Sequence, residues 1–214
     1  MKILGVIPAR AGSKRLANKN TTDLGGVPLW RHALKHAKDS NVIDVSVVTT
    51  NDPLILSDSS DVWTITRPES LCQDDTEMFP VVQHAFNQVI HLTGSIFGAV
   101  CVLQPTSPFR TGADIAACVD IMETSGAYSV VSVFDGPEDL AFKVRHAGRL
   151  ERVPEIVVPN GAIYLLRTDA LERGQDWYGD HIYHHKMPRD RSLDINVHFD
   201  LEVARMLWSK KTEA

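Results

Sequence analysis

The residues best suited to chemistry form a cationic cluster near the start of the chain. Arg10, Lys14, Arg15 and Lys19 fall within ten residues. The small residues Ala11-Gly12-Ser13 lie between the first two cations and would let backbone N–H groups approach an anion closely, while arginine supplies a planar fork of donors and lysine a point charge. Together these groups are suited to binding a polyphosphate.

The position of this cluster favours a binding role over the alternative, a solvated basic loop. The cluster directly follows the predicted strand Lys2–Ile7, and ligands of open α/β sheets bind at strand ends. The segment Gly12-Ser13-Lys14 is not a Walker A motif, because it lacks the earlier glycine and the Ser/Thr after the lysine, and the loop does not read GxGxxG. A P-loop kinase or a dinucleotide-binding protein is therefore not indicated.

The composition limits the classes of protein to be considered. The chain has 214 residues, of which 43% are hydrophobic and 23% charged, as expected for one soluble domain spanning residues 1–214. Its 22 Lys and Arg against 27 Asp and Glu give a formal net charge of -5, which argues against nucleic acid or an anionic membrane as the main partner. Any anion site must therefore be local.

The cysteines and the N-terminal residues favour a cytoplasmic protein. Cys72, Cys101 and Cys118 are odd in number and widely spaced, which argues against a disulfide framework or a zinc cluster and for a reducing compartment. The apolar run Ile3–Ile7 is interrupted by Pro8 and is too short for a secretory signal or a membrane span. We therefore expect a cytoplasmic location and no membrane association.

Short β-rich segments alternate with helical patterns along the chain, which is typical of an α/β sheet built from crossover units. Strands are predicted at Lys2–Ile7, Asp44–Thr50, Val62–Thr66, Phe97–Leu103, Ala127–Phe134 and Gly161–Leu166. Helices are predicted at Pro28–Asp39, Glu77–Leu92 and Gly112–Thr124, with a short helix ending at Leu56 and a terminal helix carrying Phe199, Val203, Met206 and Leu207. This order of elements predicts an α/β fold with a mostly parallel sheet.

Two further segments carry weaker signals. Phe142–Arg152 is charged and weakly patterned. His181, His184 and His185 lie close together, but on a strand the second would face away from the other two, and no cysteine or second cluster of the sequence completes a coordination shell. An exposed edge strand is therefore expected there rather than a metal site.

Four motifs, in order along the chain, resemble those of acylneuraminate (CMP-sialic acid type) cytidylyltransferases. They are Ile7-Pro8-Ala9-Arg10 through Ser13-Lys14 to Lys19-Asn20, then Leu103–Arg110 (LQPTSPFR), Pro159–Tyr164 (PNGAIY) and Ser192–Ile195 (SLDI). A chance match of all four is far less expected than a match of one. The KDO cytidylyltransferases share the opening Ile-Pro-Ala-Arg but usually have proline where this chain has Asn20, which favours the acylneuraminate branch.

The resemblance implies a three-layer α/β/α nucleotidyltransferase fold, Rossmann-like, with a mostly parallel mixed sheet. It implies the reaction of CTP with an acidic nine-carbon (nonulosonic) sugar to give a CMP-sugar and pyrophosphate, with Mg²⁺, in a homodimer. Such a transfer mainly requires the protein to position two anions and to neutralise developing charge. Two alternatives stay open: a KDO-type or other sugar cytidylyltransferase, and a degenerate nucleotide-binding regulatory protein without turnover.

The resemblance also assigns roles to individual residues by their position in the motifs. It assigns catalysis on the phosphates to Arg10, Lys14 and Lys19, nucleotide binding to Ala11, Gly12, Ser13, Asn20 and Arg67, sugar binding to Gln104, Thr106, Ser107, Lys143, Asn160, Tyr164, Trp177 and Tyr178, and metal binding to Asp194 and Asn196. The Trp-Tyr pair falls where the family has an aromatic pair lining the acyl pocket, and we expect it on a surface turn.

Several of these residues also have a simpler structural explanation. Ser107 lies in a proline-bracketed turn, where its hydroxyl would cap the next helix. Tyr164 would be a half-buried strand aromatic, and Lys143 a solvated lysine. Asp194 would be a turn or helix-entry residue. The environment of each side chain therefore separates the two explanations.

The chain departs from the family pattern at several positions. Asn196 replaces the second aspartate of the usual metal pair, so that an amide carbonyl remains but a charge is lost. Asn51 replaces an aspartate near the nucleotide, and Val158 stands where an arginine commonly reaches into the partner subunit. The insertion that builds the dimer and helps bind the sugar in the family is predicted to be shortened here, around residues 135–160.

Overall fold

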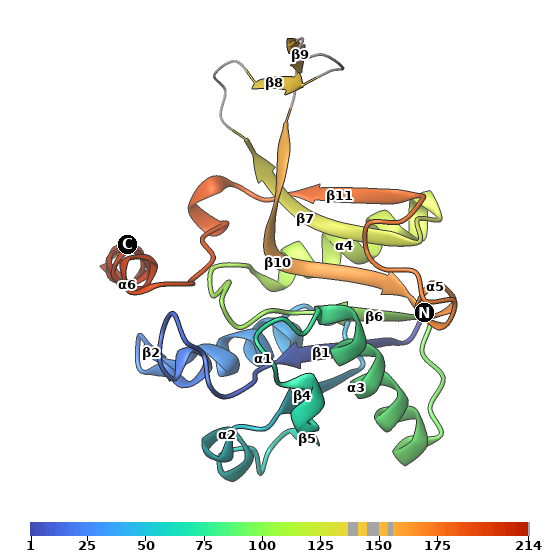
Figure 1. Ribbon diagram of the computed structural model, residues 1–214, viewed down its shortest axis with the longest axis vertical. Helices are drawn as coiled ribbons and strands as arrows, with labels where there is room; N and C mark the ends of the chain where they lie inside the picture. Colours follow the sequence, from blue (N-terminus) through green and yellow to red (C-terminus); the bar gives the residue numbers. More distant parts are fainter. Residues whose placement is uncertain (137–140, 145–149, 154–155, 214) are drawn as a thin grey trace.

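The computed structural model describes the backbone of residues 1–136, 141–144, 150–153 and 156–213. It describes the side chains of residues 1–136 and 156–211. Its centre is a seven-stranded sheet in the order β11-β7-β10-β6-β1-β4-β5 (Figure 1). The strands are β1 (Ile3–Pro8), β4 (Val45–Thr50), β5 (Trp63–Thr66), β6 (Ala99–Val102), β7 (Ser129–Asp135), β10 (Val157–Arg167) and β11 (Ile182–Lys186). Within this sheet β10 pairs antiparallel with both β6 and β7, whereas the other pairs are parallel, so the other six strands share one direction.

The side chains of β1 alternate between two hydrophobic clusters, one on each face of the sheet. Ile3 and Ile7 pack in the cluster that includes residues of α1 (Leu29–Asp39) and α4 (Gly112–Ser125). Leu4 and Val6 pack in the cluster that includes residues of α3 (Met78–Thr93) and α5 (Thr168–Glu172). A central strand covered on both faces needs apolar residues at successive positions, which explains the continuous apolar run in the sequence.

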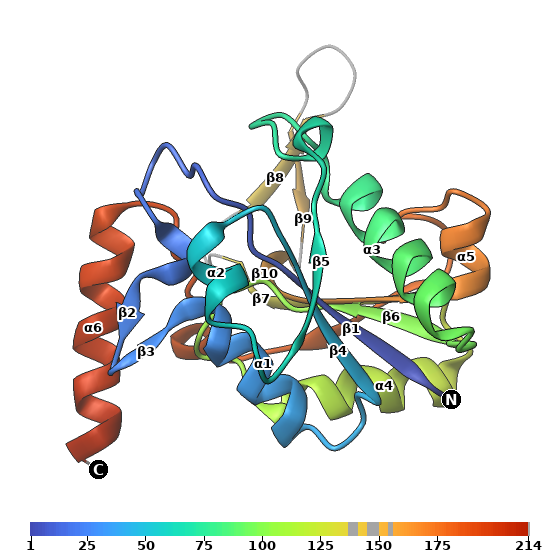
Figure 2. The ribbon, with the colours of Figure 1, turned by 90° about the horizontal axis from the view of Figure 1, so that it is seen from below.

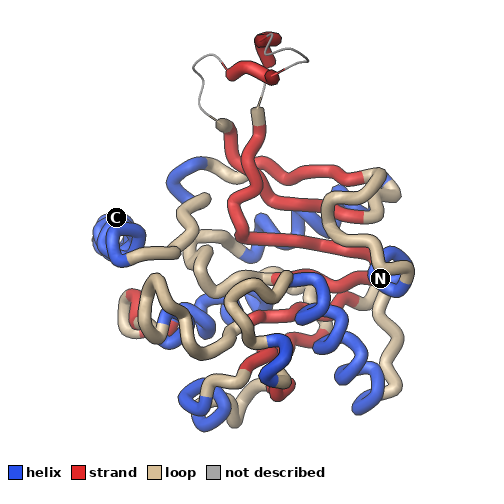
Figure 3. Tube along the Cα trace, viewed as in Figure 1, coloured by secondary structure: helices blue, strands red, loops and turns tan. Residues whose placement is uncertain are grey.

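The helices complete a three-layer arrangement. Figure 2 shows α1 and α4 on one side of the sheet, and α3 and α5 on the other side. The predicted three-layer α/β/α fold with a mostly parallel mixed sheet is therefore confirmed. Figure 3 shows loops, in tan, gathered beyond the carboxyl ends of β1 and β6, on the left of the central sheet. The functional residues predicted from the sequence lie mainly at this edge.

The remaining elements are short or peripheral. They are β2 (Asp23–Leu24), β3 (Val27–Pro28), α2 (Pro53–Ser57), β8 (Ala141–Val144), β9 (Leu150–Val153), α6 (His198–Glu213) and the 3-10 turns η1 (Lys19–Thr21), η2 (Glu69–Leu71) and η4 (Arg189–Arg191). The antiparallel pair β8 and β9 projects from the body of the molecule, and α6 lies at the side, against β2 (Figures 1 and 2). In the described part of the chain, no helix has the length and apolar character needed to cross a membrane.

Most predicted elements are present, with ends that differ by at most two residues. The strand predicted at Gly161–Leu166 is too short, because β10 already starts at Val157. The first part of β10 was not predicted because it contains Pro159 and Gly161, which are uncommon inside strands. Gly161 has a φ of +75°, and the register of the pairing with β7 shifts between Pro159 and Tyr164. The weakly patterned segment Phe142–Arg152 contains parts of β8 and β9, which the sequence did not indicate. The predicted edge strand is confirmed as β11, which contains His184 and His185 but begins after His181.

The N-terminus of α4 is anchored to the sheet edge by Asp114. Thr111 and Asp114 form a capping box, in which the Asp114 carboxylate accepts the Thr111 N–H at 2.8 Å. The same carboxylate accepts from His185 of β11 at 3.1 Å and from Arg191 of η4. Burial alone would raise the pKa of Asp114, but the hydrogen bonds from His185, Arg191 and Thr111 outweigh burial and hold this pKa well below its ordinary value.

Replacing Asp114 with alanine is expected to lower the free energy of unfolding by about 2–4 kcal/mol, because a cap and a buried ion pair are lost. Since the folded-state pKa is lowered, this stabilisation is complete above the unfolded-state pKa of about 3.9 and declines as the pH falls toward the folded-state value. Urea unfolding of both proteins between pH 7 and pH 3 would measure the difference. A gap that stays constant over this range would contradict the prediction.

The matched control for this experiment is Asp120→Ala. Asp120 lies on the same helix with an exposed side chain. Its replacement is expected to change the free energy of unfolding by less than about 0.5 kcal/mol, as for an ordinary surface substitution.

Candidate functional site

Segments that follow the carboxyl ends of β1, β5 and β6 line a cleft with a volume of about 410 Å³. Parallel pairing brings these strand ends to one edge of the sheet, so loops that are far apart in the sequence meet there. The predicted residues that line the cleft are Arg10, Ser13, Lys14, Lys19, Asn20, Arg67, Gln104, Thr106 and Asn196. The structure therefore brings together the cationic cluster and most of the proposed nucleotide contacts.

The loop that carries the cations is held against the end of β4 by hydrogen bonds. The Thr50 hydroxyl donates to the carbonyl of Ala9 at 2.6 Å, and Asn51 Oδ1 accepts the N–H of Ala11 at 2.9 Å. From the other side, Asn20 Nδ2 donates to the carbonyl of Arg10 at 2.9 Å. The N–H of Ala11, which the sequence assigned to phosphate, is thus already bonded to Asn51.

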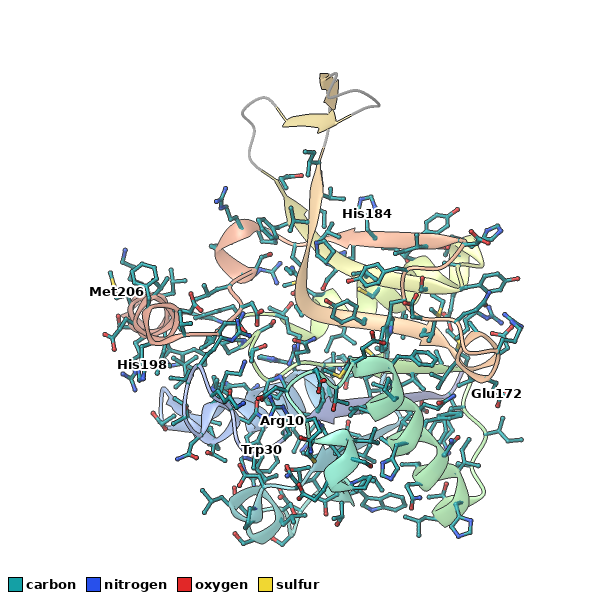
Figure 4. The ribbon with its side chains drawn as sticks, in the orientation of Figure 1. Arg10, Trp30, Glu172, His184, His198 and Met206 are labelled. Atoms are coloured by element: carbon teal, nitrogen blue, oxygen red, sulfur yellow. The ribbon has the colours of Figure 1, made fainter. Side chains whose placement is uncertain are left out.

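The cations of this loop divide into two pairs with different partners. Arg10 and Lys14 both form ion pairs with Asp74, at 2.8 Å from Arg10 Nη2 and at 2.5 Å from Lys14 Nζ. Figure 4 shows Arg10 near the centre of the molecule. Arg15 and Lys19 instead donate to Asn196 Oδ1, at 3.2 and 3.3 Å. Asp74 was not identified from the sequence, because it is a single acidic residue in a segment without a recognisable pattern.

Lys19 lies deeper in the cleft than Lys14. Burial lowers the pKa of Lys19, and the positive charges of Arg15 and Arg10 act in the same direction, whereas the negative charge of Asp194 opposes this change. A partly desolvated ammonium interacts more strongly with an anion than an exposed one does. Lys19 is therefore well placed to neutralise charge on a bound phosphate.

Asp194 is the residue whose environment best fits a metal ligand. Its Oδ2 accepts from Asn196 Nδ2 at 2.7 Å, but its Oδ1 is buried without a hydrogen-bond partner. An unpartnered carboxylate oxygen is a hard donor of the type that Mg²⁺ prefers. Asn196 presents its N–H group to Asp194 and its carbonyl to Arg15 and Lys19, so of these two residues Asp194 is the one that offers an unpartnered oxygen.

The segment that carries Asp194 is fixed on both sides. The N–H of Ile195 donates to the carbonyl of Thr106 at 2.8 Å. Asp200 accepts the N–H groups of Asn196 and Val197, at 2.8 and 2.9 Å, and so caps the start of α6. Asp194 is therefore not the capping residue of the terminal helix. Among the described residues, no group of three or more His, Cys, Asp or Glu side chains could hold a metal by itself, so a metal here would share its coordination with a ligand.

Arg67 provides a buried donor at another part of the cleft. Its side chain is only 5% exposed, and its Nη2 donates to the carbonyl of Thr49 at 2.9 Å. Burial lowers the pKa of this guanidinium to about 10. The apolar residues Leu71 and Val81 line the cleft as well. A donor beside apolar surface suits a planar heterocycle with acceptor atoms.

A second pocket of about 290 Å³ shares Met78 and Gln104 with the main cleft. It is lined by Phe79, Tyr164, Trp177 and Tyr178, and the ring centroids of Tyr164 and Trp177 are 5.6 Å apart. The expectation that both aromatic residues 177 and 178 lie on the surface is wrong for Trp177, which is 6% exposed, whereas Tyr178 is 56% exposed. The packing of Trp177 against two other rings explains its burial. Burial also raises the pKa of Tyr164.

Two residues assigned to the sugar are buried and line neither pocket. Asn160 is 3% exposed, and its Oδ1 accepts from Ser132 Oγ at 2.6 Å and from the N–H of Ala162 at 3.1 Å. Ser107 is fully buried, and its hydroxyl donates to the carbonyl of Asn160 at 3.5 Å. Ser107 does not cap α4, because Thr111 does. The side chain of Lys143 lies outside the described residues.

Arg110, quoted in the LQPTSPFR motif without a role, fixes the loop after β6. It is 1% exposed, and its Nη1 donates to the carbonyls of Gln104 and Ala162, each at 2.8 Å. The guanidinium of Arg110 thus links this loop to the bend in β10 by hydrogen bonds. Gln104, which lines both pockets, takes its position from this contact.

A family model described as cytidylyltransferase matches residues 4–204. The chain belongs to the cytidylyltransferase family. This cytidylyltransferase-family chain is 39% identical over 238 residues to CMP-N,N'-diacetyllegionaminic acid synthase of Legionella pneumophila, with 100% of this chain and 99% of that protein covered. It is 25% identical over 231 residues to pseudaminic acid cytidylyltransferase of Campylobacter jejuni, with 100% and 99% covered. The resemblance carried by the four sequence motifs is confirmed.

One relative is longer than this cytidylyltransferase-family chain. The N-acylneuraminate cytidylyltransferase of Escherichia coli O18:K1:H7 is 29% identical over 226 residues, which cover 98% of this chain but 53% of the relative. The chain therefore spans about half the length of that relative.

Two solved structures share the fold of this cytidylyltransferase-family chain. CMP:2-keto-3-deoxy-manno-octonic acid synthetase complexed with CTP aligns with a TM-score of 0.75 at 18% identity, covering 99% of this chain and 100% of that one. The 4-diphosphocytidyl-2C-methyl-D-erythritol synthase from Anaerococcus prevotii aligns with a TM-score of 0.65 at 11% identity, covering 97% and 98%. At these identities the likeness concerns the fold alone.

Replacing Asn160 with alanine is expected to lower the free energy of unfolding by about 2–3 kcal/mol without any ligand, because the buried N–H of Ala162 would lose its acceptor and the hydrogen bonds to Ser132 and Ser192 would be lost. Urea unfolding at pH 7 would measure this loss. Asn87→Ala, at an exposed position of α3, serves as the control and should change stability by less than about 0.5 kcal/mol. Equal stability of the two variants would show that Asn160 is not part of the framework.

Proposed function

We propose that this chain couples CTP to an acidic nonulosonic sugar, giving a CMP-sugar and pyrophosphate. The observation that carries the proposal is the gathering of Arg10, Lys14, Arg15 and Lys19 in one cleft that borders an aromatic pocket. The curated relatives named for N-acylneuraminate, N,N'-diacetyllegionaminic acid and pseudaminic acid support a sugar of this class.

In the proposed complex, the apolar end of the main cleft binds the base of CTP, and the cationic loop binds its triphosphate. The base lies against Leu71 and Val81, where Asn20 and the buried Arg67 guanidinium offer donors to its ring nitrogen and carbonyl. The triphosphate lies along the cationic loop, where Arg10 and Lys14 hold its outer phosphates and Gly12 and Ser13 add backbone N–H groups. Lys19, the more buried lysine, lies near the α-phosphate.

The proposed transfer is an in-line displacement at the α-phosphorus. The anomeric oxygen of the sugar forms the new O–P bond while the bond to the bridging oxygen breaks, pyrophosphate leaves, and the hydroxyl proton passes to solvent. Lys19 and Arg10 neutralise the charge that moves to the phosphate oxygens. We propose Mg²⁺ as the metal, held by Oδ1 of Asp194, with Asn196 as a second position; when bound it would supply additional charge neutralisation.

The aromatic pocket is the proposed site for the acyl-amino side of the sugar. Tyr164, Trp177 and Tyr178 offer flat apolar surfaces, and Gln104 offers an amide at the boundary with the main cleft. Thr106 offers a hydroxyl to the sugar from the loop after β6. The buried Asn160 and Ser107 are joined by a hydrogen bond, and in the proposal they hold the bend of β10 and the loop after β6 in place without touching the sugar.

Two aspects of the assembly belong to the same proposal. We propose that residues 1–214 act as a single cytidylyltransferase domain in a cytoplasmic homodimer, with a shortened insertion around residues 135–160. In such a dimer, Lys143 would reach the neighbouring active site. The formal net charge of -5 supports a protein whose partners are small anions bound locally rather than nucleic acid.

Pyrophosphate release tests the proposal directly. The protein with CTP, Mg²⁺ and N-acetylneuraminic, N,N'-diacetyllegionaminic or pseudaminic acid is expected to release pyrophosphate with at least one sugar, and UTP, ATP and GTP should not replace CTP. Turnover with KDO alone would support the KDO-type alternative. Selective thermal stabilisation by CTP without turnover of any acid sugar would support a nucleotide-binding regulatory protein.

Replacing Arg10 with alanine is expected to lower kcat/KM for CTP by about 10- to 100-fold, because a charge-assisted phosphate contact worth about 1.5–3 kcal/mol is lost. Steady-state pyrophosphate release would measure this loss. Lys35→Ala, which removes an exposed cation on α1 outside the cleft, is the control and should leave the kinetics unchanged. Wild-type kinetics in the Arg10 variant would remove Arg10 from the site.

Replacing Asn196 with aspartate is expected to lower the Mg²⁺ concentration for half-maximal activity by about 3- to 10-fold, because a second carboxylate would lie beside Asp194. The new charge would also raise the pKa of Lys19, since an anion near an ammonium favours its charged form. A Mg²⁺ titration at fixed CTP would measure the change, with Asn87→Asp as the control for added charge. An unchanged titration would argue that residue 196 is not a ligand.

A further inference from the structure

Asp74 lies in the cleft opposite the cationic loop. A carboxylate at this place needs an explanation, because its negative charge would repel a bound phosphate. It follows η2 in a short segment that contacts Arg10 twice, through the Asp74 carboxylate at 2.8 Å and through the carbonyl of Cys72 at 3.4 Å. The same carboxylate pairs with Lys14 at 2.5 Å. One anion of the chain therefore engages two cations assigned to the phosphates.

These ion pairs are of the kind that a ligand can replace. The Asp74 side chain is 43% exposed and that of Lys14 is 81% exposed, so water screens their attraction. The hydrogen bonds from Lys14 and Arg10 lower the pKa of Asp74, so the carboxylate is charged at neutral pH. A triphosphate carries several negative charges and many acceptor oxygens, and it would compete with one carboxylate for both cations.

The other two cations of the loop donate their described hydrogen bonds to an uncharged group rather than to a carboxylate. Arg15 and Lys19 donate to the neutral amide oxygen of Asn196. The cleft thus has one part whose cations form ion pairs with Asp74 and another whose cations donate to an amide, with Asp194 acting on Lys19 only through its charge. The part paired with Asp74 is the one proposed to hold the outer phosphates, which leave with pyrophosphate.

We propose that Asp74 is an internal counter-anion that occupies the place of the outer phosphates in the empty cleft. A polyphosphate displaces it, and it pairs again with Arg10 and Lys14 as pyrophosphate leaves. Asp74 thereby weakens the binding of CTP and of pyrophosphate alike, and it leaves ligands without these phosphates unaffected. This inference rests on the proposed function, because it takes the cationic loop as the triphosphate site.

The test is a binding series with Asp74→Asn, measured by isothermal titration calorimetry with CTP, pyrophosphate and cytidine. The variant keeps the shape of the side chain and removes its charge. We expect it to bind CTP and pyrophosphate roughly three- to tenfold more tightly than the wild type, with unchanged affinity for cytidine. The affinity for CTP should also fall more steeply with added salt in the variant, because more unpaired positive charge faces the ligand.

Asp75→Asn is the matched control. Asp75 is the adjacent residue, exposed and without an ion pair within the described residues. Its replacement removes the same charge from the same segment but not from Arg10 and Lys14. Equal tightening of CTP binding in both variants would overturn the inference, because the effect would then arise from net charge rather than from the pairing.

The remaining outcomes separate this inference from the proposed function. Unchanged or weaker CTP binding by Asp74→Asn, with a wild type that binds and turns over CTP, would overturn the role of Asp74 and leave the proposed function standing. A wild type that neither binds CTP nor releases pyrophosphate with any acid sugar would overturn both.

Discussion

The site depends on the parallel pairing of β1 with β4 and with β6. In this register, Pro8 lies beside Thr49, and the three strands end at one edge. The backbone of Ala9 is bonded to residues 49 and 50, so the cationic loop cannot shift without breaking the sheet at its end. Because the four cations of the loop repel one another, the loop needs a firm attachment where it leaves β1. The chemistry of the cleft is therefore a consequence of strand register.

The sequence predicted the fold and the cationic loop well, because both leave local signals. Apolar runs in β1 and β6 and the periodicity of α3 are visible without any structure. The bend in β10 was not predictable in the same way. Pro159 and Gly161 usually indicate a turn, and here they lie inside a strand whose two halves pair in different registers. Tertiary pairing, which the sequence does not display, decides this case.

The exposure of the residues at the candidate site was predicted less well than the fold. Motif positions indicate which residues gather at a site, but not which of them reach its surface. Asn160 and Trp177 are buried against neighbours from distant elements, and that burial depends on packing. Asp74 was missed for the opposite reason, since it does reach the site. No pattern in the sequence distinguishes it from Asp75, and only the fold brings it to Arg10 and Lys14.

Met78 and Gln104 belong to both pockets, so the two chambers have a common boundary. A substitution at either residue would reshape both pockets at once. Phe79, Tyr164, Trp177 and Tyr178 line the smaller pocket but not the main cleft, so a substitution at one of them can change the smaller pocket alone. If the proposed function holds, preference for the sugar can therefore diverge without any change to the residues around the nucleotide.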